Sequence, residues 1–367
     1  MTDIRIKRWA EVLVNYSLGV KKNDLMQIKS SWLADPLIKE VYKLALEKGA
    51  HPYVTYVGEG LSEIFFKYAS EEQLNFLSPI ERYEIEKIDK YLYIIAEFNR
   101  KSLSNVDPKK LGLRRKATGK LLERRLQRAA QGKLRWTLTA YPDNAQAQDA
   151  EMSLEEFSEF IFEAGFLNDK DPIKRWQKLA EEQQRLSKIL AKFDKITIRA
   201  PETDLTVSVK GRKWISCEGH ENFPDGEIFT APIEDSAEGI ITYSYPCVYQ
   251  GREVSNVKLR FKRGVVIEAT ADKGEDYLRS MINIDAGAKR IGEFSFGTNY
   301  GIKKFIKNIL FDEKIGGTIH IALGSCYPET GGKNKSSLHW DMICDLRHDA
   351  EVLADGQVIY CNGKFLI

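Results

Sequence analysis

Residues 24–57 contain three segments in succession, which read DLMQIK (24–29), PLIKEVYKLALEKGA (36–50) and HPYVTYV (51–57). The first and third are short apolar runs typical of strands, whereas the second places apolar residues at helical spacing. Pro36 is placed to begin the helix and Gly49 to end it, as the fixed and the permissive φ of these residues favour. The pattern predicts a strand–helix–strand unit.

The same alternation continues along the first half of the chain. Strands are predicted in YLYIIAEF (91–98) and LRWTLTAYP (134–142), with a long basic helix between them at residues 108–131. We interpret the basic side chains as a solvated helix face, because leucines give the helix an amphipathic pattern. No GxGxxG follows the first strand, so a dinucleotide site is unsupported. We predict an α/β N-terminal domain, residues 1–150, with a largely parallel open sheet.

The pattern changes twice in the second half. A capping box at Ser153 and Glu156 begins a helical stretch, from which we predict a helical connector at residues 151–194. After Lys195 the sequence consists of short alternating runs, with Asp-Gly at 355–356 and Asn-Gly at 362–363 as hairpin turns. We predict an α+β, sheet-rich C-terminal domain over residues 195–367.

Composition excludes several classes of partner. The chain has 55 basic and 53 acidic side chains and a formal charge of only +2, which favours no nucleic-acid partner. The first residues, MTDIRIKRWAEVLV, lack the apolar core of a signal peptide, and no run of about 18 apolar residues occurs. Five cysteines without a CxxC pair indicate reduced thiols. We therefore expect a cytoplasmic protein without a membrane partner.

The strongest chemical pattern lies between residues 317 and 346. His320 is on an alternating run whose neighbours on the same face, Ala322 and Gly324, leave room beside the imidazole. His339 and Asp341 are two positions apart, so on a strand both side chains project from one face. Imidazole and carboxylate together suit zinc, cobalt or manganese. Each pattern alone also fits a hydrogen-bonded core histidine, but their coincidence indicates a metal site.

Two acidic residues stand in glycine-flanked settings elsewhere in this half. Glu227 lies in NFPDGEIFTAP (222–232) and Glu293 in IGEFSFGTN (291–299). On composition alone, either carboxylate could equally be a solvated loop acid.

These two segments, GTIHIALGSCYPETGGKN (317–334) and SLHWDMICDLR (337–347) give the chain its resemblance to a known family. It resembles the aminopeptidase T family, metallopeptidases that remove N-terminal residues from peptides, over nearly its whole length. The resemblance implies an α/β N-terminal domain, a C-terminal catalytic domain, two divalent metal ions and a homodimer. It implies that the metal ligands are Glu227, Glu293, His320, His339 and Asp341, with Tyr327 as a catalytic or metal-contacting phenol.

The function that the resemblance implies is hydrolysis of the N-terminal peptide bond of peptides by water that two metal ions activate. Tyr327 follows His320 after a glycine-containing turn, so its hydroxyl could donate to the tetrahedral oxyanion, or its ring could simply pack as an aromatic. Glu313 and Glu329 are both candidates for the general base. The alternative function is that of another binuclear metallohydrolase, an amidase acting on a non-peptide substrate.

Overall fold

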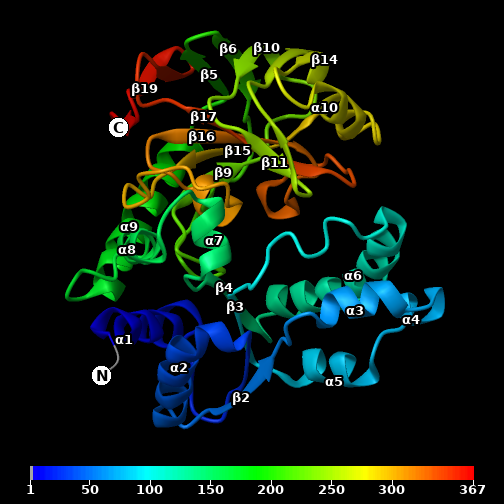
Figure 1. Ribbon diagram of the computed structural model, residues 1–367. Helices are drawn as coiled ribbons and strands as arrows, with labels where there is room; N and C mark the ends of the chain where they lie inside the picture. The colour runs from blue at the N-terminus through cyan, green and yellow to red at the C-terminus, as the bar shows by residue number, and fades with distance from the viewer. Residues whose placement is uncertain (1–2) are drawn as a thin grey trace. The chain divides into compact units, whose positions relative to one another are not determined.

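The structure is a computed structural model that describes residues 3–367 (Figure 1). The chain forms two compact units, the first comprising Met1–Ile173 with Gly219–Pro224 and the second Lys174–Glu218 with Asp225–Ile367. The segment predicted as a helical connector contributes α8 (Leu154–Ala164) to the first unit and most of α9 (Pro172–Leu190) to the second. No helix among residues 3–367 is long and apolar enough to cross a membrane.

The first unit is built on a five-stranded sheet in which every neighbouring pair is parallel. The strand order is β2 (His51–Tyr56), β1 (Leu25–Ser30), β3 (Lys90–Ile95), β4 (Arg135–Ala140) and β8 (Asn222–Phe223). Helix α2 (Asp35–Glu47) connects β1 to β2 with Pro36 in its first turn, as the sequence predicted. The predicted parallel sheet is confirmed, and β8 joins it from a distant part of the sequence.

Four helices of the first unit lie close together, and the longest of them packs against two of the others (Figure 1). These are α3 (Leu61–Tyr68), α4 (Glu71–Asn75), α5 (Pro79–Lys87) and α6 (Pro108–Ala130). Besides α2 and α8, the unit also contains α1 (Ile4–Glu11) and α7 (Asn144–Asp149).

The basic side chains of α6 have a structural role that the sequence did not reveal. Lys110 donates to the carbonyl of Phe66 in α3, and Arg114 donates to the carbonyl of Phe76 at the end of α4. Arg128 donates to the carbonyl of Ile88 at the end of α5, 2.7 Å away. Because the last carbonyls of a helix lack intrahelical donors, cations there satisfy them and complement the helix dipole. Part of the predicted solvated face therefore ties three helices together.

The second unit consists mainly of antiparallel sheet. An eight-stranded sheet has the order β14 (Val265–Thr270), β13 (Lys258–Lys262), β10 (Glu238–Thr242), β6 (Thr203–Ser208), β5 (Lys195–Ala200), β18 (Glu351–Ala354), β19 (Gln357–Cys361) and β20 (Lys364–Phe365). A five-stranded sheet has the order β17 (His339–Asp345), β16 (Thr318–Gly324), β15 (Ile291–Gly297), β9 (Glu227–Thr230) and β7 (Ile215–Cys217). The remaining elements are β11 (Cys247–Tyr249), β12 (Arg252–Val254), α10 (Glu275–Ile282) and α11 (Ile309–Asp312).

Both predicted tight turns are present. Asp355 and Gly356 join β18 to β19, and Asn362 and Gly363 join β19 to β20. All four residues have positive φ, between 45° and 88°, which is the conformation of the two-residue turns that suit the twist of hairpins. The sheet-rich α+β character predicted for this half is confirmed.

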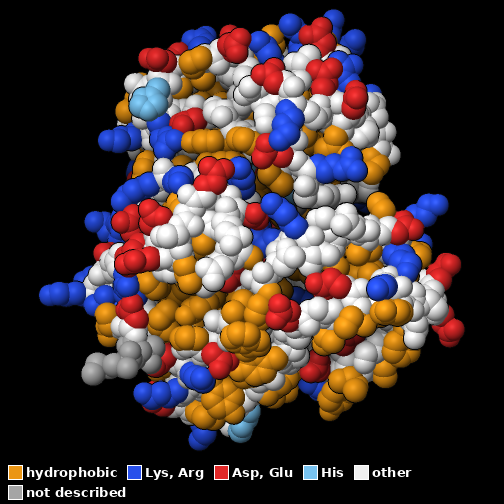
Figure 2. Space-filling model, viewed as in Figure 1, with side chains coloured by type: hydrophobic (Ala, Val, Ile, Leu, Met, Phe, Trp, Pro, Cys, Tyr) orange, Lys and Arg blue, Asp and Glu red, His pale blue; other side chains and the backbone are white. Residues whose placement is uncertain are grey.

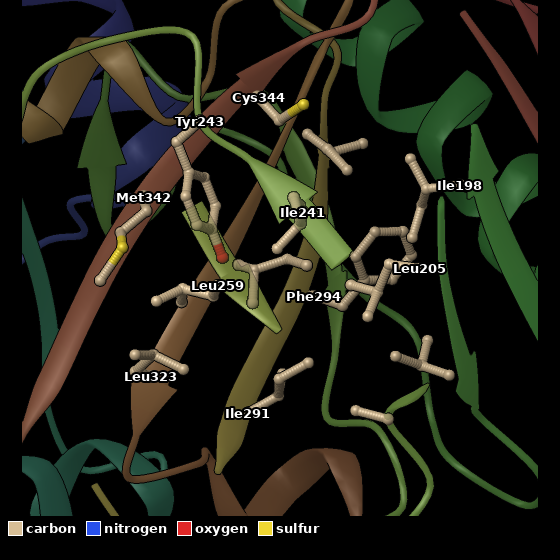
Figure 3. Packing of buried hydrophobic residues seen from close by; sticks show 14 of the residues in the cluster. Ile198, Leu205, Ile241, Tyr243, Leu259, Ile291, Phe294, Leu323, Met342 and Cys344 are labelled. Carbon is tan, nitrogen blue, oxygen red and sulfur yellow. The ribbon is translucent and has the colours of Figure 1, made fainter. Parts of the chain in front are cut away.

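The core of the second unit lies between its two large sheets. Figure 3 shows Phe294, Leu323 and Met342 of the five-stranded sheet packed with Leu205 and Leu259 of the eight-stranded sheet. All five side chains are fully buried. Successive side chains of a strand point to opposite faces, so the residues that alternate with these apolar ones lie on the other face of the five-stranded sheet.

Candidate metal centre

The other face of the five-stranded sheet carries all five residues predicted as metal ligands. Glu227 begins β9, Glu293 lies in β15, His320 in β16, and His339 and Asp341 in β17. In two groups, Glu227 with Glu293 and His320, and Glu293 with His339 and Asp341, the possible ligand atoms lie within 4.8 Å of one another. The structure therefore brings together side chains from four adjacent strands.

Strand register leaves space at the middle of this face. Ala322 lies opposite both Glu293 and Asp341, so the smallest chiral side chain separates two carboxylates. Gly324 lies opposite His339, and Gly297 lies opposite Glu227. Four of the five predicted ligands thus face alanine or glycine across the sheet, whereas His320 lies between Ser295 and Ile343.

The two imidazoles are oriented in the same way. Nδ1 of His320 is 3.0 Å from the carbonyl oxygen of Glu313, and Nδ1 of His339 is 2.9 Å from the carbonyl oxygen of Ser325. A carbonyl can only accept, so Nδ1 carries the proton and Nε2 remains to receive a cation. Metal-binding histidines are commonly fixed by such a backbone contact.

Distances around Nε2 fit ligands that surround an ion. Nε2 of His320 is 3.2 Å from Glu293 Oε1 and 3.3 Å from Glu227 Oε2. Nε2 of His339 is 3.4 Å from Asp341 Oδ1 and 3.5 Å from Glu293 Oε2. Most of these distances are long for hydrogen bonds. Bonds of about 2.0–2.2 Å from a shared ion to nitrogen and oxygen would place adjacent ligand atoms about 3.0–3.5 Å apart.

Two carboxylates occupy special positions in this arrangement. Glu293 directs Oε1 to His320 and Oε2 to His339, so it faces both imidazoles with different oxygens. Oδ1 of Asp341 is buried and, among residues 3–367, has no hydrogen-bond partner. A buried carboxylate oxygen without a donor is costly unless a cation balances it, so the residues present fit a metal ion.

The pKa values report a strongly negative potential in the cluster. Burial raises the pKa of Glu227 and Glu293. Burial lowers the pKa of His320, but its hydrogen bond with Glu293 and the charge of Glu227 outweigh this and raise the pKa to about 10. His339 reaches about 10 in the same way beside Asp341, whose own pKa falls to about 2 because the imidazolium charge outweighs burial. A field that holds protons this firmly attracts any cation.

Tyr327 lies beside the cluster, in the loop between β16 and β17. Its ring packs edge-on against the His339 imidazole at 5.3 Å between centroids and lies 5.4 Å from the ring of Phe229. Its side chain is 44% exposed. Loss of water around the phenol, together with the charges of Glu293 and Asp341, raises the pKa of Tyr327, so the hydroxyl keeps its proton and can donate.

Two polar contacts hold this loop against the rest of the second unit. Both oxygens of Glu234 accept from Arg212 at 2.8 Å, and Oε1 also accepts from the backbone N–H of Lys333 at 2.7 Å. Asn334 donates to the carbonyls of Gly287 and Gly324.

One neighbour of the cluster was predicted from the sequence only as one of two candidate bases, and a second neighbour was not predicted. Of the two candidate bases, Glu313 lies with His320 and Asp341, whereas Glu329 is exposed in the short 3-10 turn Pro328–Thr330. Lys314 was not predicted at all, although its Nζ is hydrogen-bonded to Glu313 and lies 3.7 Å from Glu227 Oε1. Nothing in its sequence context distinguishes it from an exposed lysine.

A sheet face that gathers two oriented imidazoles and several buried carboxylates around a partnerless oxygen is typical of a metal-dependent hydrolase. The sequence model of the thermophilic metalloprotease (M29) family matches residues 2–365, and the chain belongs to this family.

Individual relatives agree with that membership. Aminopeptidase 2 of Geobacillus stearothermophilus is 27% identical over 362 residues, which cover 91% of this chain and 86% of that protein. Aminopeptidase T of Thermus thermophilus is 27% identical over 380 residues, covering 92% of this chain and 91% of that protein. The solved structure of wild-type AmpT from Thermus thermophilus has the same fold, with a TM-score of 0.85, 24% identity and 99% coverage of both chains. The resemblance to the aminopeptidase T family, the predicted fold class and the prediction of a metal-dependent peptidase are confirmed.

Proposed function

We propose that this metalloprotease is an aminopeptidase that hydrolyses the N-terminal peptide bond of peptides at a centre of two divalent ions. The proposed ligands are Glu227, Glu293, His320, His339 and Asp341, all in the catalytic domain that we assign to residues 195–367. The observation that carries the proposal is the orientation of the Glu293 carboxylate. Its two oxygens face two different imidazoles, and each imidazole is oriented by a backbone carbonyl.

Glu293 would be shared between the two groups of ligands in this proposal. It is the member common to the group with Glu227 and His320 and to the group with His339 and Asp341. A two-ion site needs at least one ligand that reaches both ions, and a carboxylate with its oxygens directed apart can do so. Zinc, cobalt and manganese all suit this mixture of nitrogen and oxygen ligands.

The bound ions would supply the Lewis acidity that polarises the scissile carbonyl and makes water a nucleophile at neutral pH. Tyr327 would donate its hydroxyl proton as a hydrogen bond to the oxyanion that develops on the carbonyl oxygen. Its raised pKa favours the protonated phenol that this role requires.

Glu313 is our candidate for the general base. It lies with His320 and Asp341 but outside the proposed ligand set, and its carboxylate accepts from Lys314. Burial raises its pKa, which moves it towards the range in which a carboxylate can take a proton from water and return it to the leaving amine.

The proposal is tested by hydrolysis of aminoacyl-p-nitroanilides and of the same substrates with an acetylated α-amino group. We expect cleavage of the free substrates alone, its loss after chelation, and its return with added zinc, cobalt or manganese. Cleavage of acetylated substrates would indicate the alternative, an amidase acting on other bonds. Activity unchanged by complete metal removal would contradict the proposal.

We also propose that the protein acts in the cytoplasm as a homodimer, as the family resemblance implies. Exposed apolar side chains gather over α3–α5 of the first unit, and Figure 2 shows such patches on one face of the molecule. Leu61, Ile64 and Tyr68 of α3 are 61%, 56% and 72% exposed. Light scattering after size-exclusion chromatography should give twice the chain mass of 42.0 kDa, and the chain mass itself would contradict the dimer.

A further inference from the structure

Lys314 is a completely buried cation beside the proposed metal centre. Its side chain is 0% exposed, and it follows α11 in the segment that leads to β16. Its Nζ donates to Glu313 and lies 3.7 Å from Oε1 of Glu227. Asp225 also acts on it electrostatically. Lys314 therefore contacts the cluster at Glu313 and Oε1 of Glu227, which we call its outer side. The two imidazoles lie on the inner side.

Because of Lys314, the two oxygens of Glu227 have different partners. Oε1 faces the ammonium group, whereas Oε2 lies 3.3 Å from Nε2 of His320 and accepts from the hydroxyl of Ser295 at 3.0 Å. Glu227 is thus held from both sides. Only one of its oxygens is directed towards the proposed ions.

A buried ammonium is costly, so its presence needs a balancing charge. Five carboxylates lie in the cluster or act on Lys314, namely Asp225, Glu227, Glu293, Glu313 and Asp341. If the two imidazoles are neutral ligands, two divalent ions and one ammonium neutralise these five charges. Without the ammonium, one negative charge would remain in a cluster whose carboxylates are largely buried. A third divalent ion would then be attracted.

A set of ligand atoms for such an ion already exists on this outer side. Cys217 Sγ, a carboxylate oxygen of Asp225 and one of Glu227 lie within 4.8 Å of one another. Cys217 pairs directly with Glu227 across β7 and β9, so the thiol is fixed in place by the sheet. Thiolate and carboxylates together would suit a soft divalent ion such as zinc or cadmium. Lys314 lies 3.7 Å from Glu227 of this set, and the charge of Asp225 also acts on it.

We propose that Lys314 is a built-in cation that limits the centre to two divalent ions. Its positive charge replaces the charge that a third ion would supply at Cys217, Asp225 and Glu227. Its contact with Oε1 of Glu227 leaves Oε2 directed towards His320 and the proposed ions. The inference rests on the proposed two-ion function. Lys314 is a positioning residue, since it acts through Glu227 and Glu313.

The test compares the parent protein with Lys314→Met, which removes the charge at similar volume, and Lys314→Arg, which keeps it. Each protein is stripped with chelator, loaded with cadmium, dialysed and analysed for metal per chain. The ultraviolet charge-transfer band of a cadmium thiolate is recorded with and without Cys217→Ser in each background. If Lys314→Met does not fold, Lys314→Gln replaces it, because the amide still bonds to Glu313 without carrying charge.

We expect the neutral variant to hold about one more ion per chain than the parent, with a thiolate band that Cys217→Ser removes. Lys314→Arg should match the parent, which should show no band that depends on Cys217. Equal or lower metal content in the neutral variant, or a Cys217-dependent band in the parent, would overturn the inference. A parent with one ion or none would instead count against the two-ion function, because the inference concerns the difference between the proteins.

Discussion

The two faces of the five-stranded sheet in the second unit differ in composition, although the same strands build both. In β16, Ile319, Ile321 and Leu323 are fully buried against the eight-stranded sheet, whereas the alternate residues His320 and Ala322 belong to the polar face. The apolar face contributes stability through burial. The polar face concentrates charge that only a cation can balance. Neighbouring residues of one strand should therefore respond to substitution in different ways.

The largest effect is expected on the polar face, at Glu293. Glu293→Gln keeps the side-chain volume but removes the negative charge that faces both imidazoles. Loss of metal ligation should cost several kcal/mol of transition-state stabilisation, on the order of 10³-fold or more in kcat/KM. Kinetics with an aminoacyl-p-nitroanilide and metal analysis measure it. Near-normal rates with full metal content would show that Glu293 is not a ligand.

The next effect is expected one residue along, on the apolar face. Phe294 is 0% exposed and packs edge-on against Trp214 at 5.9 Å and against Phe296 at 5.1 Å. Phe294→Ala should lower the free energy of unfolding by about 3–5 kcal/mol, because it deletes a buried ring and leaves a cavity. Denaturant titration measures this. The folded fraction should retain its metal, and a variant as stable as the parent but inactive would contradict the division between the faces.

The sequence predicted those features of the fold and the site that depend on residues close together in the chain. Period-two alternation in residues 317–346 was enough to place His339 and Asp341 on one face and His320 beside small residues, and the Asp-Gly and Asn-Gly turns predicted their hairpins. Glu227 and Glu293 carried no such local signal. Their place in the cluster depends on pairing between β9, β15 and β16, which brings together residues more than 25 positions apart.

Non-local packing also explains what sequence reasoning missed. Asn222 and Phe223 form β8 beside β4 in the first sheet, although they lie within the range 195–367 that the sequence assigned to the C-terminal domain. Lys314 resembles any surface lysine in the printed sequence, and only the fold shows it buried against Glu227 and Glu313.

A smaller effect is expected from filling the space at the middle of the polar face. Ala322 lies opposite Glu293 and Asp341, so Ala322→Val would place two methyl groups among the proposed ligands. Overpacking of this kind costs about 1–3 kcal/mol, which corresponds to about a tenfold to hundredfold loss of metal affinity if the centre bears the strain. Competition with a chromophoric chelator measures the affinity. Ala322→Gly is the matched control and should retain metal, and equal affinity in the valine variant would place the ions elsewhere.

The smallest effect concerns Asp285, which accepts hydrogen bonds from the residues that lead into β17. Its carboxylate accepts from the backbone N–H of Ser337 and the hydroxyl of Ser336, which lowers its pKa from 3.8 to about 2. A depressed folded-state pKa stabilises the protein above the unfolded value, so this contribution should be lost as the pH falls from about 4 to about 2. Denaturant titrations of the parent and Asp285→Asn across this range measure it. An identical pH dependence in both proteins would contradict the expectation.

The most direct measurement of the central claim is anomalous diffraction from crystals loaded with zinc, recorded on both sides of its absorption edge. We predict two peaks on the polar face of the five-stranded sheet, one beside Nε2 of His320 and one beside Nε2 of His339, with Glu293 between them. A map without peaks at these imidazoles, or with zinc bound elsewhere while the enzyme is active, would contradict the claim that this face is the catalytic metal centre.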